Sequence, residues 1–134
     1  MIASGAPVEA VTGADESRQY WTVVGSHVVV DIYPIFFPVL QITLAFQLGL
    51  KPWQVAVIYA SNQILSGLPQ SLAAWLSDRH DTRIAGPIGL TMSCVCACLI
   101  GFAPNFWVLW LLLAIAMIGN GIYHPIAGAQ AGQL

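Results

Sequence analysis

Charged residues are scarce in this sequence. Only 7% of its 134 residues are aspartate, glutamate, lysine or arginine, whereas a soluble globular domain carries about 25%. Hydrophobic residues make up 57% of the chain, and the mean hydropathy is +0.75. A soluble fold of this length has too small an interior to bury so much apolar surface. The composition therefore excludes a soluble domain and predicts an integral membrane protein.

The patterns of several other protein classes are also missing. The net charge is −2 and no basic run occurs, which argues against nucleic acid as a partner. Residues 1–19 are polar and acidic, whereas a secretory signal peptide begins basic and then turns apolar. The sequence contains no phosphate loop, nucleophile elbow or metal-ligand spacing. We therefore expect no catalytic residues, no cofactor and no resident metal.

The three cysteines are few and lie together in one apolar stretch. On a helix Cys94 and Cys98 share a face and Cys96 points nearly opposite, so none can form a disulfide with another. Packing by small side chains explains them, and a soft-metal site is the alternative.

Four apolar stretches are each long enough to cross a bilayer, which takes about 20 residues in a helix. Short segments that contain glycine, proline or charged residues separate them. The predicted organisation is a flexible tail at residues 1–20 and transmembrane helices at about residues 21–46, 53–76, 84–103 and 106–126. The sequence thus predicts an all-α, polytopic membrane protein.

The basic residues predict the orientation in the membrane. With four spans, the tail and the loop at residues 77–83 lie on one side, which holds Arg18, Arg79 and Arg83. The other side holds only Lys51. Because short cytoplasmic loops are enriched in lysine and arginine, we expect a cytoplasmic N-terminus.

Asp31 is the one acidic or basic residue inside a predicted span. It lies about ten residues into the first span, roughly 15 Å deep at 1.5 Å per residue. A charge there costs about 2.5–3.5 kcal/mol or more, and such residues usually face a bundle interior or a watery path. A functional carboxylate and a hydrogen-bonded structural carboxyl are both consistent with this position.

Four further residues of the first span extend along the same face as Asp31. His27, Asp31, Pro34, Pro38 and Gln41 follow one another at spacings of 4, 3, 4 and 3 residues. Each proline frees a backbone carbonyl, which is tolerated in a membrane only where protein or water pairs with it. We therefore predict that this polar stripe faces a polar interior and that His27 can share the proton of Asp31.

Two other spans contribute candidate residues. The fourth span carries Asn120 and His124, and the predicted topology puts His124 at the depth of His27. In the second span a polar stripe includes Gln63, alongside Tyr59, Ser66 and Gln70. The candidate cavity residues are thus Asp31, His27, His124, Asn120 and Gln63. Contacts between helices explain the amides of the second span equally well.

Small residues four apart also predict helix packing. Gly67 with Ser71, and Gly128 with Gly132, have the spacing that lets two membrane helices approach closely. We expect these pairs to lie at contacts between helices and to carry no chemistry.

The turn after the second span, residues 74–83, resembles the signature loop of the major facilitator superfamily. That motif reads glycine-x-x-x-aspartate-basic-x-glycine-basic-basic. Three positions match it, namely Asp78, Arg79 and Arg83. Three positions depart from it, namely Ala74, Asp81 and Thr82. Asp78, His80 and Asp81 also suggest a metal, but a solvated turn explains them more simply.

Further stretches are similar to the fosmidomycin-resistance branch of this superfamily. Residues 27–38 resemble its first helix, residues 119–125 its fourth helix with a histidine-proline pair, and residues 101–107 its external turn. The resemblance covers about residues 25–134. It implies a twelve-helix transporter made of two six-helix halves, whose first and fourth helices line a central cavity. It also implies alternating access, often driven by protons.

The resemblance implies roles for individual residues. His27, Asp31 and His124 would line the cavity, and Asp78 and Arg79, with Arg83 in the same loop, would close the cytoplasmic side. Four spans are about one third of such a transporter, so we expect an N-terminal fragment in the bacterial inner membrane. Its partners would be a small solute, protons, lipid and the remaining helices, with no nucleic acid.

Two other functions remain open from the sequence. The chain could be a complete four-helix transporter of the small multidrug type, which also has one membrane carboxylate in its first helix. It could instead be a membrane scaffold or assembly subunit whose polar stripes only hold helices together.

Overall fold

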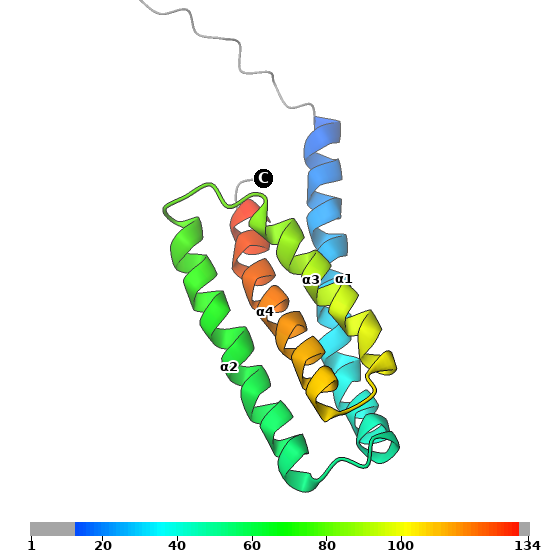
Figure 1. Ribbon diagram of the computed structural model, residues 1–134. Helices are drawn as coiled ribbons and strands as arrows, with labels where there is room; N and C mark the ends of the chain where they lie inside the picture. The colour runs from blue at the N-terminus through cyan, green and yellow to red at the C-terminus, as the bar shows by residue number, and fades with distance from the viewer. Residues whose placement is uncertain (1–12, 132–134) are drawn as a thin grey trace, which may run out of the picture.

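The computed structural model describes residues 13–131, and these residues form helices and short connections without any strand. Figure 1 shows the four long helices running side by side. The elements are α1 (Gly13–Gln47), α2 (Pro52–Ser77), α3 (Ala85–Leu99), the short 3₁₀ helix η1 (Ile100–Phe102) and α4 (Phe106–Ala131). The predicted all-α class is confirmed.

Several helix ends coincide with residues that suit a turn or a cap. Gly49, at a φ of +59°, lets the chain turn after α1 in a conformation that other residues rarely adopt. The backbone N–H of Lys51 donates to Oε1 of Gln54 at 2.7 Å at the start of α2. At the start of α4, the backbone N–H of Val108 donates to Oδ1 of Asn105 at 3.1 Å. These side chains satisfy helix-end groups that would otherwise lack a partner.

Within residues 13–131, three segments are long and apolar enough to cross a membrane: Ser17–Gln47, Ala85–Phe102 and Phe106–Ala131. The 26 residues of α2 would also reach across, but the amides and hydroxyls of its polar stripe lower its hydropathy. Its crossing stays a prediction. α1 begins at Gly13, so residues 13–20, which we assigned to the tail, are helical. Residues 1–12 lie outside the described part of the chain.

Most of the core belongs to α4. This helix packs against α2 on one side and α3 on another, and α1 lies behind it in Figure 1. Leu109 and Leu113 are almost completely buried, together with Ile58 of α2. The indole N–H of Trp110 donates to the hydroxyl of Ser61 at 3.0 Å and links α4 to α2. α4 is therefore the helix against which the other three are positioned.

Glycines allow the backbones of neighbouring helices to come very close. A Cβ atom added to Gly119 of α4 would lie 2.5 Å from the carbonyl oxygen of Gly89 in α3. A Cβ atom on Gly89 would lie 2.6 Å from the carbonyl oxygen of Gly119. A Cβ atom on Gly121 would meet the carbonyl oxygen of Ser66 in α2. A side chain at these positions would force α4 away from both neighbours.

The small-residue pairs predicted from spacing lie elsewhere. Gly67 and Gly128 are exposed, and nothing lies within 4 Å of a Cβ atom built on either. The hydroxyl of Ser71 donates to the carbonyl of Gly67 within its own helix. The prediction that Gly67 and Ser71 lie at a contact between helices is therefore wrong for the described residues. Gly132 lies outside them.

α1 packs against the other helices through residues seven apart. Val30, Phe37 and Leu44 are 1%, 5% and 8% exposed. At 100° per residue these three residues follow one edge of the helix, and Gln41 is buried beside them. The polar stripe with Asp31 lies beside this packed edge. The contacts of α1 with the other helices are made mainly by its large apolar side chains.

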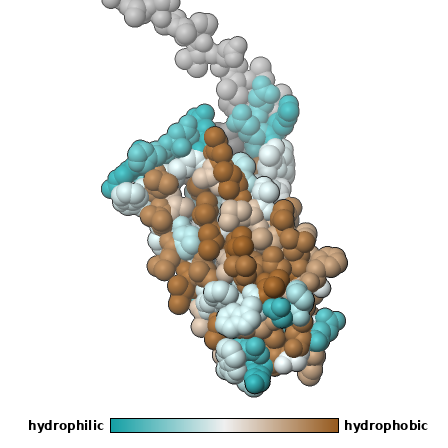
Figure 2. All heavy atoms as spheres, viewed as in Figure 1, coloured by the Kyte–Doolittle hydropathy of each residue, from teal (hydrophilic) through white to brown (hydrophobic). Residues whose placement is uncertain are grey.

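Polar residues collect at the ends of the bundle. The start of α1, the loop after α2 and the end of α4 share one end, and the loop after α1 and η1 share the other (Figure 1). Figure 2 shows hydrophobic residues over most of the face between these ends. The start of α1 and the predicted loop therefore lie at the same end of the bundle. Whether that end is cytoplasmic stays a prediction.

Candidate functional site

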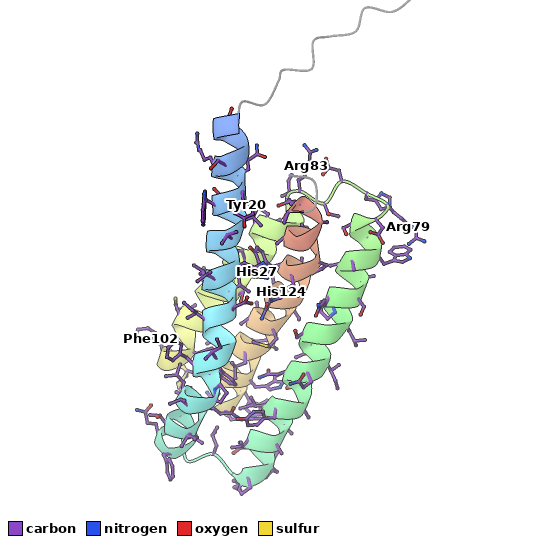
Figure 3. All side chains as sticks on the ribbon, turned by 180° about the vertical axis from the view of Figure 1, so that it is seen from behind. Tyr20, His27, Arg79, Arg83, Phe102 and His124 are labelled. Carbon is purple, nitrogen blue, oxygen red and sulfur yellow. The ribbon has the colours of Figure 1, made fainter. Side chains whose placement is uncertain are left out.

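His27, Asp31 and His124 come together between α1 and α4. Nε2 of His27 lies 3.8 Å from Oδ2 of Asp31, and Nε2 of His124 lies 3.6 Å from Oδ1 of Asp31. The centroids of the two imidazole rings are 4.9 Å apart. Figure 3 shows the two histidines side by side, one from each helix. The carboxylate of Asp31 thus has an imidazole next to each of its oxygens.

A pair of hydroxyls joins α1 to α4 beside this cluster. The Tyr123 hydroxyl lies 2.6 Å from Oγ of Ser26, which itself donates to the carbonyl of Val23 at 2.9 Å. Tyr123 therefore donates to Ser26, and its side chain is buried at 4% exposure. Ser26 and Tyr123 were not among the predicted site residues. The signal in the sequence was their position, since each directly precedes one of the two histidines.

The cluster opens at the surface of the described chain. The side chains of Asp31, His27 and His124 are 51%, 39% and 26% exposed. Asp31 lies near the middle of the segment Ser17–Gln47, which is long and apolar enough to cross a membrane. The distances of 3.6 and 3.8 Å exceed those of a hydrogen bond. The three side chains therefore lie next to one another without a direct hydrogen bond between them.

Among the described residues, Asn62, Asn120 and Gln41 have buried amide atoms without a hydrogen-bond partner, and the last two are buried side chains. Asn120, one turn before His124, is 5% exposed, and its Oδ1 is unpaired. Gln41 is 3% exposed, and neither its Oε1 nor its Nε2 is paired. An unpaired buried polar group costs about 1–3 kcal/mol. Both amides are therefore positioned to accept a polar partner.

Other residues of the predicted polar stripes differ in their exposure. Gln63 is exposed on α2. Pro38 is exposed on α1, and the side chain of Pro34 lies outside the described part of the structure. The five-residue stripe of α1 therefore divides, because Gln41 turns into the packed edge while His27 and Asp31 face His124.

An apolar groove follows α2 and α4 on another face of α4. From α4 it is lined by Ile118, Ile122 and Ile126. Ile122 and His124 are two residues apart and project about 200° apart around the helix axis. The groove and the polar cluster therefore face different sides of α4, and the groove offers no ionisable side chain to a ligand.

The predicted gate residues are all exposed in the loop after α2. The guanidinium of Arg79 lies 4.2 Å from the ring centroid of Trp75, one turn earlier. Arg83 pairs with Asp81, with 3.7 Å between Nε and Oδ1, and its backbone N–H donates to the same carboxylate. Asp78 caps the end of α2 with its backbone N–H. Each arginine thus has a neighbour within the loop or in the last turn of α2.

The hydroxyl pair leads to a stability prediction. Replacing Tyr123 with phenylalanine should lower the free energy of unfolding by about 0.5–1.5 kcal/mol, because one buried hydrogen bond between α1 and α4 is lost. Unfolding in mixed detergent micelles, followed by circular dichroism, measures this change. Tyr59→Phe is the matched control, since Tyr59 is 47% exposed. If the effect of Tyr123→Phe persists in full when Ser26 is already alanine, the hydroxyl pair is not its cause.

Comparisons with known proteins bear on what such a bundle does. The sequence model of the Major Facilitator Superfamily matches residues 25–134. A Bacillus subtilis (strain 168) protein described as "Uncharacterized MFS-type transporter YfnC" is 26% identical over 94 residues. These residues are 70% of this chain and 22% of that protein, so the chain spans about a fifth of its length. No solved structure matches significantly.

Proposed function

Because the chain belongs to the Major Facilitator Superfamily, we propose that it is the N-terminal part of a secondary active transporter that moves a small solute or drug by alternating access, coupled to protons. The similar protein of B. subtilis is described as a transporter, and the superfamily match supports transport rather than catalysis. The family match also favours this function over a small multidrug-type transporter or a membrane scaffold.

One observation carries the proposal of proton coupling. A carboxylate near the middle of an apolar helix has two imidazoles within 3.8 Å. Protonation removes the charge of a carboxylate, whose burial in a membrane is costly. Histidine changes its charge near neutral pH, and interacting groups exchange protons as a unit. Asp31, with His27 and His124, is therefore the proposed proton-coupling group.

The buried amides support a cavity beside that group. Asn120 lies one turn from His124 along α4 and has an unpaired oxygen, which suits contact with a polar solute. Gln63 is a further proposed cavity residue, because its side chain is exposed on α2 and a substrate could contact it there. The remaining helices of the transporter would cover the exposed apolar surface of α1, which includes Val29 and Phe36.

The charged loop is proposed as the cytoplasmic gate. Asp78, Arg79 and Arg83 lie at the end of the bundle where α1 starts, and the basic residues of this end favour the cytoplasm. We place the protein in the bacterial inner membrane with a cytoplasmic N-terminus. An antiporter of the fosmidomycin-resistance branch is the more specific form of the proposal.

The proposal requires water next to Asp31, which cysteine labelling tests. In full-length transporter whose Cys94, Cys96 and Cys98 are replaced by serine, Asp31→Cys should react with a charged, membrane-impermeant thiol reagent. Val29→Cys is the control, because Val29 is 54% exposed, lies at nearly the same depth and projects from nearly the opposite side of α1.

We expect Asp31→Cys to react about tenfold faster than Val29→Cys or more, because a thiol in an apolar medium stays protonated and unreactive. Labelling from one side of the membrane should dominate, and a solute of the transporter should slow it. Equal and slow reaction at both positions would show that the carboxylate faces lipid, and the transport proposal would fail.

A further inference from the structure

We propose that His27, Asp31 and His124 form a binding site for a divalent first-row transition-metal ion, such as Zn²⁺ or Co²⁺. One donor atom from each residue lies within 4.8 Å of the other two. The sequence predicted no resident metal, because it contains no metal-ligand spacing and His124 lies about a hundred residues after His27 and Asp31. The inference rests on this packing of α1 against α4, and it extends the proposed function by naming a ligand class for the same site.

The distances between the donor atoms suit a metal better than a hydrogen bond. Donors at about 2.0–2.2 Å from a tetrahedral Zn²⁺ stand roughly 3.3–3.6 Å apart. Nε2 of His124 lies 3.6 Å from one carboxylate oxygen of Asp31, and Nε2 of His27 lies 3.8 Å from the other, whereas an N–H···O bond measures about 2.7–3.2 Å. The two donor atoms that are farthest apart lie within 4.8 Å of each other. Side-chain rotations that bring these two atoms closer by about 1–1.5 Å would give the spacing that a tetrahedral metal needs.

The chemistry of the donors selects the class of metal. Two imidazoles and one carboxylate suit zinc, cobalt, nickel and other transition metals, whereas Mg²⁺ and Ca²⁺ prefer oxygen ligands. Three protein ligands leave at least one coordination position open. The exposed fractions of 51%, 39% and 26% leave room for water or a small anion there. One carboxylate reduces the charge of a bound divalent ion to +1, so an anionic ligand is favoured in the open position.

The surroundings hold the ligands in place. His27 and Asp31 are one turn apart on α1, and the neighbouring Ser26 is bonded to Tyr123 of α4 at 2.6 Å. That contact fixes the distance between the helices next to His124. Because the ligands come from both helices, a bound metal would join α1 to α4 and resist their separation.

Other groups of the chain could bind a metal and must be separated from this site. Cys94, Cys96 and Cys98 are free thiols on α3. His80 is exposed in the loop after α2. Thiolate ligands produce a charge-transfer absorption with Co²⁺ that imidazole and carboxylate ligands do not, so the two kinds of site differ in their spectra.

Titration of the purified 134-residue chain with Co²⁺ in detergent micelles tests the proposal. We expect one equivalent to bind with visible d–d absorption and without a thiolate band. Removing a partner of a metal ligand typically weakens binding about 10–100-fold, so loss of a ligand should cost at least as much. His27→Gln, Asp31→Asn and His124→Gln should each show this loss, while His80→Gln and the triple Cys→Ser variant should bind as the unaltered chain does.

A measurement on the unaltered chain avoids any effect of substitution on folding. X-ray absorption at the zinc edge should show nitrogen and oxygen ligands, scattering from two imidazoles and no sulfur. Sulfur ligands, no binding at about 1 mM metal, or unchanged affinity in Asp31→Asn would each overturn the proposal. Proton-linked transport that depends on Asp31 would still stand after such a result, so the two proposals fail independently.

Discussion

Replacing Asp31 with asparagine should reduce proton-linked transport by the full-length transporter to the level of empty vesicles. Asparagine keeps the shape of aspartate but cannot take up or release a proton. The change should leave the fold intact, because the Asp31 side chain is 51% exposed and its nearest partners lie beyond hydrogen-bond distance. The effect should therefore fall on transport and not on stability.

The measurement uses inside-out vesicles with a pH-sensitive dye. A solute that the unaltered transporter exchanges for protons dissipates the pH gradient, and a screen of small solutes and drugs identifies it. Asp81→Asn removes a carboxylate from the exposed loop, where its side chain is 73% exposed, and should keep the flux. Proton-linked flux that survives Asp31→Asn at full rate would exclude Asp31 as the coupling group.

Replacing Gly119 with alanine should strongly destabilise the bundle. The new Cβ atom would lie 2.5 Å from the carbonyl oxygen of Gly89 and 2.9 Å from the backbone nitrogen of Ser93. Both are backbone atoms, so neither can rotate away, and α3 must move. Such overpacking typically costs about 1–3 kcal/mol, which exceeds the gain of up to about 1 kcal/mol from replacing glycine in a helix.

Gly67→Ala is the matched control and should change stability in the opposite direction. Gly67 also lies inside a helix, but nothing is within 4 Å of its added Cβ atom, so only the gain in helix propensity remains. Unfolding in mixed detergent micelles compares the two variants with the unaltered chain. If Gly119→Ala proves as stable as Gly67→Ala, the close contact between α3 and α4 does not hold the bundle together.

Local properties of the sequence predicted a large part of this architecture. The apolar runs and their breaks predicted four helices, because hydropathy and backbone breaking act over a few neighbouring residues. The spacing of His27 and Asp31 predicted that they share a face of α1, since residues four apart in a helix are always neighbours. The charged loop between α2 and α3 could be located for the same reason.

The partners across helices could not be predicted in this way. The sequence put His124 at the depth of His27, but it did not show that His124 would lie 3.6 Å from Asp31. Spacing drew attention to Gly67, whereas the close contacts occur at Gly119 and Gly121. The spacing of residues along one helix shows which of them share a face, but it does not show which helix packs against that face.

The amino-acid order alone was thus sufficient for the membrane class, the four helices and the polar face of α1, since each depends on residues close together in the chain. The rotation of each helix about its own axis and its depth relative to its neighbours required the packed bundle. These depend on where backbones approach most closely, as at Gly119 and Gly89, and on which large side chains fill the remaining space, as Phe37 and Leu44 do. That packing brings His124 to Asp31 and gathers three separate residues into one cluster.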